Sequence, residues 1–208
     1  MSAAPDEPSV TGLVLAAGAG RRMGKPKATV IGTDGVPWIV RTVRSVLAGG
    51  CDRVLVVLGS GHERARELLA QVRPGAPDGG LVRVVVAQRW TEGMGESLRA
   101  GLEAVLADAD AESRPPAAVL VQLVDLPDVG ADVIGRVTRV AGPSVLARAA
   151  YQGVPGHPVL IGVDHLGPLA ATLSGDVGAK HYLASRDVRI VECGDLAGGA
   201  DVDHRFEN

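Results

Sequence analysis

The sequence predicts an α/β fold built on a mostly parallel sheet, and three observations support this prediction. Short apolar runs alternate along the chain with segments of helical periodicity, which is the pattern of βαβ units. The runs are rich in valine and leucine, as is typical of strands buried on both faces. Aromatic residues make up only 2% of the chain, so the core must be built from aliphatic side chains.

The predicted elements follow one another in a regular order. Apolar runs predict a buried strand at residues 10–16 and three further strands, at 53–58, 81–87 and 118–124. Shorter strand candidates follow at residues 145–147, 158–161 and 188–191. Apolar residues at helical spacing predict helices that begin at Pro37 and cover 65–72, 98–106 and 133–140. Proline-rich polar stretches predict surface loops at 73–80 and 109–116.

Length and composition indicate one globular domain. The chain has 208 residues, 46% of them apolar and 22% charged, as is usual for a soluble domain. We expect a disordered tail at residues 1–9, a single domain at 10–193 and a C-terminal tail at 194–208. The net charge of -3 argues against broad nucleic acid binding, and no apolar run is long enough to span a membrane.

Two further features predict a cytoplasmic protein. The start of the chain is acidic and proline-rich, which is unlike a signal peptide. Cys51 and Cys193 lack the spacing of a metal site, and we expect both thiols to be reduced and structural.

The loop after the first strand is the most informative segment. Residues 17–27 read AGAGRRMGKPK. Gly18 and Gly20 allow the backbone to turn tightly and to approach a ligand, and successive N–H groups in such a turn bind anions. Four cations lie within seven positions, at Arg21, Arg22, Lys25 and Lys27. Glycines and cations together suit a triphosphate.

Two other interpretations of this loop compete. It nearly matches a dinucleotide-binding fingerprint, but that site needs a carboxylate at the end of the second strand. This strand ends in Leu58, Gly59 and Ser60, without one. An exposed turn without a ligand is the other alternative. A Walker A loop is excluded, because no suitable Gly-Lys-Ser/Thr sequence is present.

Residues 15–27 resemble the LAAGxGxRMGxxK signature of the nucleotidyltransferases that include the molybdenum cofactor cytidylyl- and guanylyltransferases. Four further segments resemble motifs of this family in the same order: GMGESL at 93–98, VDLP at 124–127, GHPVL at 156–160 and GDVGA at 175–179. The resemblance extends from about residue 11 to 190. It implies a three-layer α/β/α, Rossmann-like nucleotidyltransferase fold with a mostly parallel mixed sheet.

The resemblance also implies which residues bind the nucleotide. They lie in or next to the loop at residues 17–27, which we call the phosphate loop, and in GMGESL. The residues are Leu15, Ala16, Ala17, Gly18, Ala19, Gly20, Arg21, Lys27 and Ser97. Arg22, Lys27 and Asp125 are expected to be catalytic. Ser97 has an ordinary alternative role as a helix cap, and Trp90 is expected to belong to the core or to a lid.

Two carboxylates are expected at a Mg²⁺ site. Asp125 follows a buried strand, and magnesium takes one or two carboxylates together with substrate phosphates. The resemblance implies Asp125 as the main ligand and Asp176 as a second one. The alternatives are a turn started by Asp125 and a helix capped by Asp176. His157, in GHPVL, is expected to contact the acceptor substrate.

The implied function is transfer of CMP from CTP to the molybdenum cofactor, with release of pyrophosphate. CTP is favoured over GTP because the loop begins Ala16-Ala17-Gly18 and because GHPVL is typical of the cytidylyl branch. A molybdoenzyme is a further expected partner. Three alternatives remain: a transferase that uses GTP or another small phosphorylated acceptor, a non-catalytic accessory protein that binds the cofactor, and a dinucleotide-binding oxidoreductase module.

The end of the chain departs from the family pattern. Residues 201–204 read DVDH, where the family has D-[IV]-D-T, so His204 replaces a threonine. We therefore do not expect this tail to have its usual role here.

Overall fold

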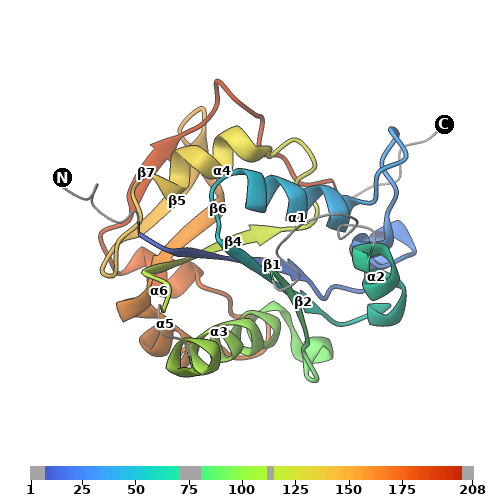
Figure 1. Ribbon diagram of the computed structural model, residues 1–208, viewed down its shortest axis with the longest axis horizontal. Coiled ribbons are helices and arrows are strands. Elements are labelled where there is room, and N and C mark those ends of the chain that lie inside the picture. The colour runs from blue at the N-terminus through green and yellow to red at the C-terminus, as the bar shows by residue number, and fades with distance from the viewer. Residues whose placement is uncertain (1–7, 71–80, 112–114, 203–208) are drawn as a thin grey trace, which may run out of the picture.

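A mixed sheet forms the centre of the molecule, with helices on both of its faces (Figure 1). The computed structural model describes residues 8–70, 81–111 and 115–202. Within these residues the sheet has seven strands, in the order β3-β2-β1-β4-β6-β5-β7. Their bounds are β1 Val10–Ala16, β2 Arg53–Leu58, β3 Val82–Val86, β4 Ala118–Leu123, β5 Leu146–Tyr151, β6 Val154–Gly162 and β7 Arg189–Glu192.

Only β6 runs against the others among the described strands. β1 pairs in parallel with both β2 and β4, β2 pairs in parallel with β3, and β5 pairs in parallel with β7. β6 is antiparallel to its neighbours β4 and β5. The predicted mostly parallel mixed sheet is therefore confirmed.

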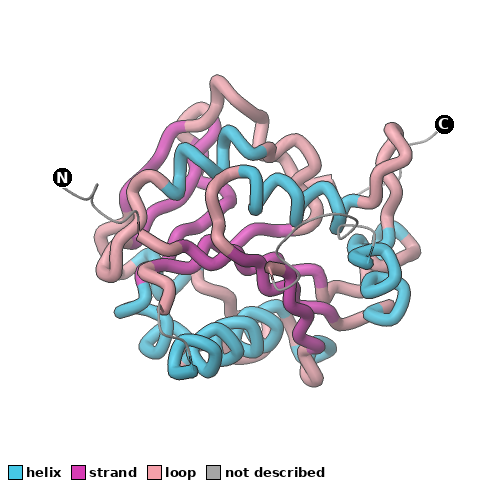
Figure 2. Tube along the Cα trace, viewed as in Figure 1, coloured by secondary structure: helices cyan, strands magenta, loops and turns pink. Residues whose placement is uncertain are grey.

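The helices form two layers around the sheet (Figure 2). One face is covered by α1 Trp38–Ala48, α2 His62–Leu69 and α4 Ala131–Thr138. The other is covered by α3 Met94–Ala111, α5 Val163–Ala170 and α6 Lys180–Ala184. The predicted α/β/α architecture is thus confirmed.

Strand β1 shows why these residues form a central strand. All seven of its residues are buried, and their side chains alternate between the two helical layers. Val14 packs with the α1 side of the core, whereas Leu13 packs with the α3 side. A Cβ atom on Gly12 would lie 2.3 Å from Cγ1 of Val46, so glycine is needed where α1 approaches the sheet.

Several predicted boundaries were wrong in the second half of the chain. α3 extends to Ala111, into the predicted 109–116 loop, and α5 was not predicted because Gly167 and Pro168 interrupt its pattern. β5 and β6 are longer than the predicted 145–147 and 158–161 strands, and form a hairpin. β7 begins one residue later than predicted. Val72 and the predicted 73–80 loop lie outside the described residues.

The predicted tails are shorter where the structure describes them. Ser9 donates a hydrogen bond of 2.6 Å to Oδ2 of Asp52, so this residue belongs to the domain. The N–H groups of Gly198 and Gly199 both donate to Asp128, and the N–H of Val202 donates to the carbonyl of Asp125. The domain boundary at residue 193 is therefore too early. Among the described residues we find no helix that is long and apolar enough to cross a membrane.

Candidate active site

The phosphate loop and Asp125 lie at the same edge of the sheet. β1 and β4 are parallel neighbours, and the chain leaves β1 into residues 17–27 and leaves β4 into Asp125. The chain connects β1 to β2 on one side, whereas β4 lies on the other, so this is a switch point in strand order. Ligands of open α/β sheets bind in the crevice at such a point.

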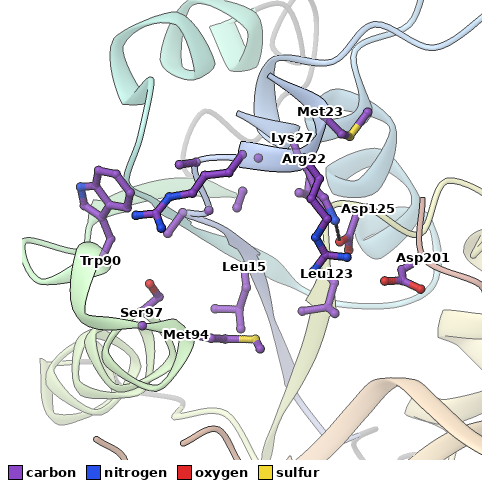
Figure 3. A pocket seen from close by; sticks show the side chains of 18 of the residues that line it. Leu15, Arg22, Met23, Lys27, Trp90, Met94, Ser97, Leu123, Asp125 and Asp201 are labelled. Atoms are coloured by element: carbon purple, nitrogen blue, oxygen red, sulfur yellow. Dashed lines mark hydrogen bonds and ion pairs between the residues drawn. The ribbon is translucent and has the colours of Figure 1, made fainter. Parts of the chain in front are cut away.

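A cleft of about 640 Å³ opens at this edge (Figure 3). Ligand pockets usually have volumes of roughly 300–1,000 Å³, so its size suits a nucleotide. Its lining comes from the phosphate loop, the start of α3, the end of β4 and two further loops: Leu15, Ala16, Ala17, Gly18, Ala19, Gly20, Arg21, Arg22, Met23, Lys27, Trp90, Thr91, Gly93, Met94, Ser97, Leu123, Val124, Asp125, Asp176 and Asp201. Every residue predicted to bind the nucleotide lines the cleft, whereas Lys25 and His157 do not.

Gly18 and Gly20 of the phosphate loop have different roles. Gly20 has a φ of 59°, and a Cβ atom there would lie 1.9 Å from the carbonyl oxygen of Lys25. Glycine is therefore required at this position for the turn itself. A Cβ atom on Gly18 would meet no protein atom within 4 Å, and Gly18 faces the cleft. Its missing side chain leaves room in the cleft instead.

A short 3-10 helix presents the loop's arginines to the cleft. It comprises Arg21–Met23, and its apolar residue Met23 is only 2% exposed, which anchors the turn in the core. Arg21 and Arg22 precede this anchor and are both exposed. Figure 3 shows the guanidinium group of Arg22 directed towards Asp125.

Lys27 and Asp125 form an ion pair across the cleft. Nζ of Lys27 lies 2.6 Å from Oδ2 of Asp125, and the two side chains are only 18% and 15% exposed. The cationic loop and the acidic strand end therefore meet, as the sequence predicted.

Trp90 and Ser97 form part of another wall of the cleft. Trp90 lies in a 3-10 turn before α3, against the end of β2, where a Cβ atom on Gly59 would lie 2.6 Å from its indole. Ser97 is the fourth residue of α3 and is 4% exposed. It lies inside the helix, so it does not cap it, and the alternative cap role was wrong.

Asp176 and Asp201 also line the cleft, from different segments. Asp176 lies beside the start of α3, since a Cβ atom on Gly93 would be 2.4 Å from its Oδ1. α6 begins at Lys180 with Ala179 as its N-cap, so Asp176 does not cap that helix. Asp201 lies beside Asp125 in Figure 3, and the adjacent Val202 N–H donates to the carbonyl of Asp125 over 3.0 Å.

The sequence interpretation missed Asp201 because it discounted the whole DVDH segment. The departure at His204, outside the described residues, weakened the motif. The aspartate three positions earlier nevertheless reaches the cleft.

His157 lies in β6, next to the cleft rather than in its lining. Two β5 side chains bind its segment: Tyr151 donates to the carbonyl of His157 over 2.6 Å, and Arg148 donates to the carbonyl of Gly156. Burial, together with the charge of Arg148, lowers the pKa of His157 to about 4, while the charge of Asp125 opposes this shift. His157 is therefore neutral at physiological pH.

The described carboxylates suit an ion that is shared with a substrate. No cluster of three or more His, Cys, Asp or Glu side chains able to hold a metal occurs in the described part of the chain. Asp125 and Asp201 are nevertheless neighbours in the cleft. Magnesium commonly uses one or two carboxylates together with phosphates of the substrate, and this donor set fits that mode.

Comparison with known proteins agrees with this geometry. Residues 12–190 match the family described as the MobA-like NTP transferase domain. The chain belongs to this family of nucleotidyltransferases. The resemblance stated from the sequence motifs is confirmed, and the protein is an enzyme of this class.

Individual relatives cover nearly the whole of this nucleotidyltransferase. It is 33% identical to nicotine blue oxidoreductase of Paenarthrobacter nicotinovorans, over 95% of this chain and 94% of the relative. The crystal structure of Rv0371c from Mycobacterium tuberculosis H37Rv is 28% identical, with a TM-score of 0.72, over 96% of this chain and 95% of that one. Rv0371c in complex with manganese is also similar, at 26% identity and a TM-score of 0.66, covering 93% and 94% of the two chains.

Proposed function

We propose that this enzyme transfers CMP from CTP to the molybdenum cofactor and releases pyrophosphate. The observation that carries the proposal is the contact between Lys27 of the cationic loop and Asp125 at the end of β4. It brings phosphate-binding and metal-binding chemistry into one cleft of nucleotide size. Glycines and cations of the loop suit the triphosphate, as the sequence motifs predicted.

In the proposed reaction a phosphate oxygen of the acceptor attacks the α-phosphorus of CTP in line with the leaving pyrophosphate. Such transfers require positioning and neutralisation of charge rather than covalent catalysis by the protein. The backbone of residues 17–20 would hold the phosphates. Arg22 and Lys27 would neutralise charge that develops on the α-phosphate and the pyrophosphate.

A divalent ion, Mg²⁺ in our proposal, would be held by Asp125 with a second carboxylate. Asp201 is the neighbour of Asp125, and Asp176 faces the cleft from the α3 side, so both are candidates for that second position. When bound, the ion neutralises phosphate charge and orients the reacting groups. The manganese complex of Rv0371c supports a divalent ion in this family.

The acceptor is placed beside His157 in this proposal. His157 is neutral and partly buried, and its charge environment includes both Asp125 and Arg148. A neutral imidazole can donate or accept a hydrogen bond without adding charge to the cleft. We therefore propose that His157 orients the acceptor through a hydrogen bond and does not act through a charge.

Pyrophosphate release tests the proposed function. The purified protein would be assayed with each of the four NTPs and Mg²⁺, with and without molybdenum cofactor. We expect release that requires the cofactor and is fastest with CTP. A preference for GTP would show that GTP, not CTP, is the nucleotide donor. Turnover with another phosphorylated acceptor would show that the acceptor is not the molybdenum cofactor. No release with any pair would contradict the proposal.

A second candidate function follows from the name of the relative from Paenarthrobacter nicotinovorans. That protein is an oxidoreductase by name, at 33% identity over nearly its whole length. In the present chain β2 ends at Leu58 and is followed by Gly59 and Ser60, without the carboxylate expected of a dinucleotide site. Oxidation of NADH or NADPH by a dye acceptor, but no pyrophosphate release, would favour this alternative.

A further inference from the structure

The first turn of α3 and the loop before α6 are joined by two hydrogen bonds. The N–H of Gly95 donates to the carbonyl of Gly175 over 2.8 Å. The N–H of Gly175 donates in return to Oε1 of Glu96 over 3.3 Å, although 79 positions separate these two residues. Consecutive residues of α3 thus bind both polar groups of Gly175, and a helix-terminal N–H finds its partner outside the helix.

This junction needs glycine on the α3 side. A Cβ atom on Gly93 would lie 2.4 Å from Oδ1 of Asp176, and one on Gly95 would lie 2.4 Å from the carbonyl oxygen of Val177. Both distances are too short for a real Cβ contact. The GMGESL and GDVGA segments are therefore packed against each other, which explains why the first has glycine at these two positions.

Glu96 is buried and does not line the cleft. Its side chain is only 5% exposed, and Glu96 is not among the lining residues. Nη1 of Arg89 lies 3.5 Å from Oε2, and Arg89 also forms hydrogen bonds with Glu92. A buried carboxylate is costly unless it is paired and hydrogen-bonded. Here the Gly175 N–H and the Arg89 guanidinium supply those partners.

We propose that Glu96 is a positioning residue, which holds Gly175 and thereby sets the place of the Asp176 carboxylate in the cleft. Asp176 follows Gly175 directly, and Met94 and Ser97 of the same helical turn line the cleft. These contacts therefore link the α3 wall of the cleft to the residue that precedes Asp176. The catalytic consequence rests on the proposed function, whereas the mechanical coupling does not.

Hydrogen–deuterium exchange tests the coupling without any assay of activity. We expect the amides of residues 174–179 to exchange at least about tenfold faster in Glu96→Ala than in the wild type, since the Gly175 N–H loses its partner. Glu96→Gln keeps an acceptor oxygen and should restore most of the protection. Unchanged exchange in Glu96→Ala would overturn the proposal.

A second pair of variants keeps the test informative if Glu96→Ala folds poorly. Gly95→Ala should separate the same two segments by steric conflict and speed exchange at 174–179. Gly167→Ala is the matched control, because a Cβ atom on this helical glycine meets nothing within 4 Å. Equal exchange in the two alanine variants would contradict the proposal.

A double-mutant cycle tests the catalytic consequence. Outer partners of metal-site carboxylates typically contribute roughly 10–100-fold to affinity or activity, so we expect a loss of that size in kcat/KM for Glu96→Ala. In the Asp176→Asn background the same change should add little, and additive losses would show that Glu96 does not act through Asp176. If the wild type releases no pyrophosphate, the proposed function fails, and the exchange experiment alone decides the coupling.

Discussion

Nζ of Lys27 lies 2.6 Å from Oδ2 of Asp125, although 98 positions of sequence separate the two residues. The contact is possible because β1 and β4 are parallel neighbours whose carboxyl ends meet at one edge. Both side chains are largely buried, so their interaction is screened less by solvent than a surface pair would be.

Removing either charge should abolish most turnover. Loss of one group that stabilises charge in the transition state typically costs about 10²–10³ in rate, and we expect Asp125→Asn and Lys27→Met to lie in this range. Pyrophosphate release measures the rate, and circular dichroism checks the fold. Asp187→Asn is a control, since this exposed carboxylate precedes β7 at the opposite edge of the sheet. Near-normal rates in both cleft variants would contradict the assignment.

Gly18 and Gly20 should respond differently to replacement by alanine. Gly20→Ala forces a side chain into a left-handed backbone and against Lys25, so we expect destabilisation of more than about 1 kcal/mol and loss of nucleotide binding. Gly18→Ala meets no protein atom, so thermal stability should stay the same while the Kd for CTP rises. Calorimetry of unfolding and of CTP binding distinguishes the two effects. Equal stability losses would show that Gly18 also serves the fold.

Replacement of Asp201 should weaken binding of the divalent ion. Because Asp201 lies beside Asp125, we expect Asp201→Asn to raise the Mn²⁺ concentration needed for half-maximal activity by roughly tenfold or more. Asp176→Asn measured in parallel reports the contribution of the α3 side. A normal Mn²⁺ requirement in Asp201→Asn, with an altered one in Asp176→Asn, would favour Asp125 and Asp176, the ligand pair that the sequence predicted, over Asp125 and Asp201.

Stability should depend on the ionisation of Glu192. Its carboxylate accepts hydrogen bonds from the N–H groups of Gly194, Gly153 and Gln152, and these bonds lower its pKa below the ordinary value of 4.5. A lowered pKa in the folded state means that this stabilisation is present above pH 4.5 and is lost as the pH falls through the folded value. The Tm of Glu192→Gln should therefore be below the wild-type Tm at pH 7, and the difference should shrink in acid.

Both cysteines should be unreactive in the folded protein. Cys51 and Cys193 are 4% and 0% exposed, and burial raises the pKa of Cys51 to about 12. The thiolate is the reactive form, so a disulfide reagent such as DTNB should modify neither thiol at pH 8. In denaturant it should modify both, because the sequence contains only these two. Rapid reaction of the native protein would contradict the packing of these residues.

The first half of the fold could be predicted because its strands are mostly apolar, with few polar residues inside them. Residues of β1 and β2 are nearly all buried, and their predicted bounds agree with the structure. In the second half, polar and glycine residues such as Arg148 and Gly156 lie within β5 and β6 and conceal the strand pattern. α5 contains Pro168, which is unusual inside a helix.

Only part of the candidate site could be predicted from the sequence. The phosphate loop and Asp125 follow apolar strands directly, so their meeting could be predicted from the rule for parallel sheets. Asp201 follows no such strand, and tertiary contacts hold its segment at the cleft, from Gly198 and Gly199 to Asp128 and from Val202 to Asp125. The role of Glu96 was also hidden, since it depends on the Gly175 N–H, a backbone group without a sequence signal.

The lining of the cleft extends from Leu15 to Asp201, which has a consequence for the newly synthesised chain. The chain leaves the ribosome N-terminus first, and a domain generally folds as a unit. The cleft can therefore be complete only after the segment that carries Asp201 has been synthesised and released. A nascent chain stalled before that segment would lack the last carboxylate of the cleft lining.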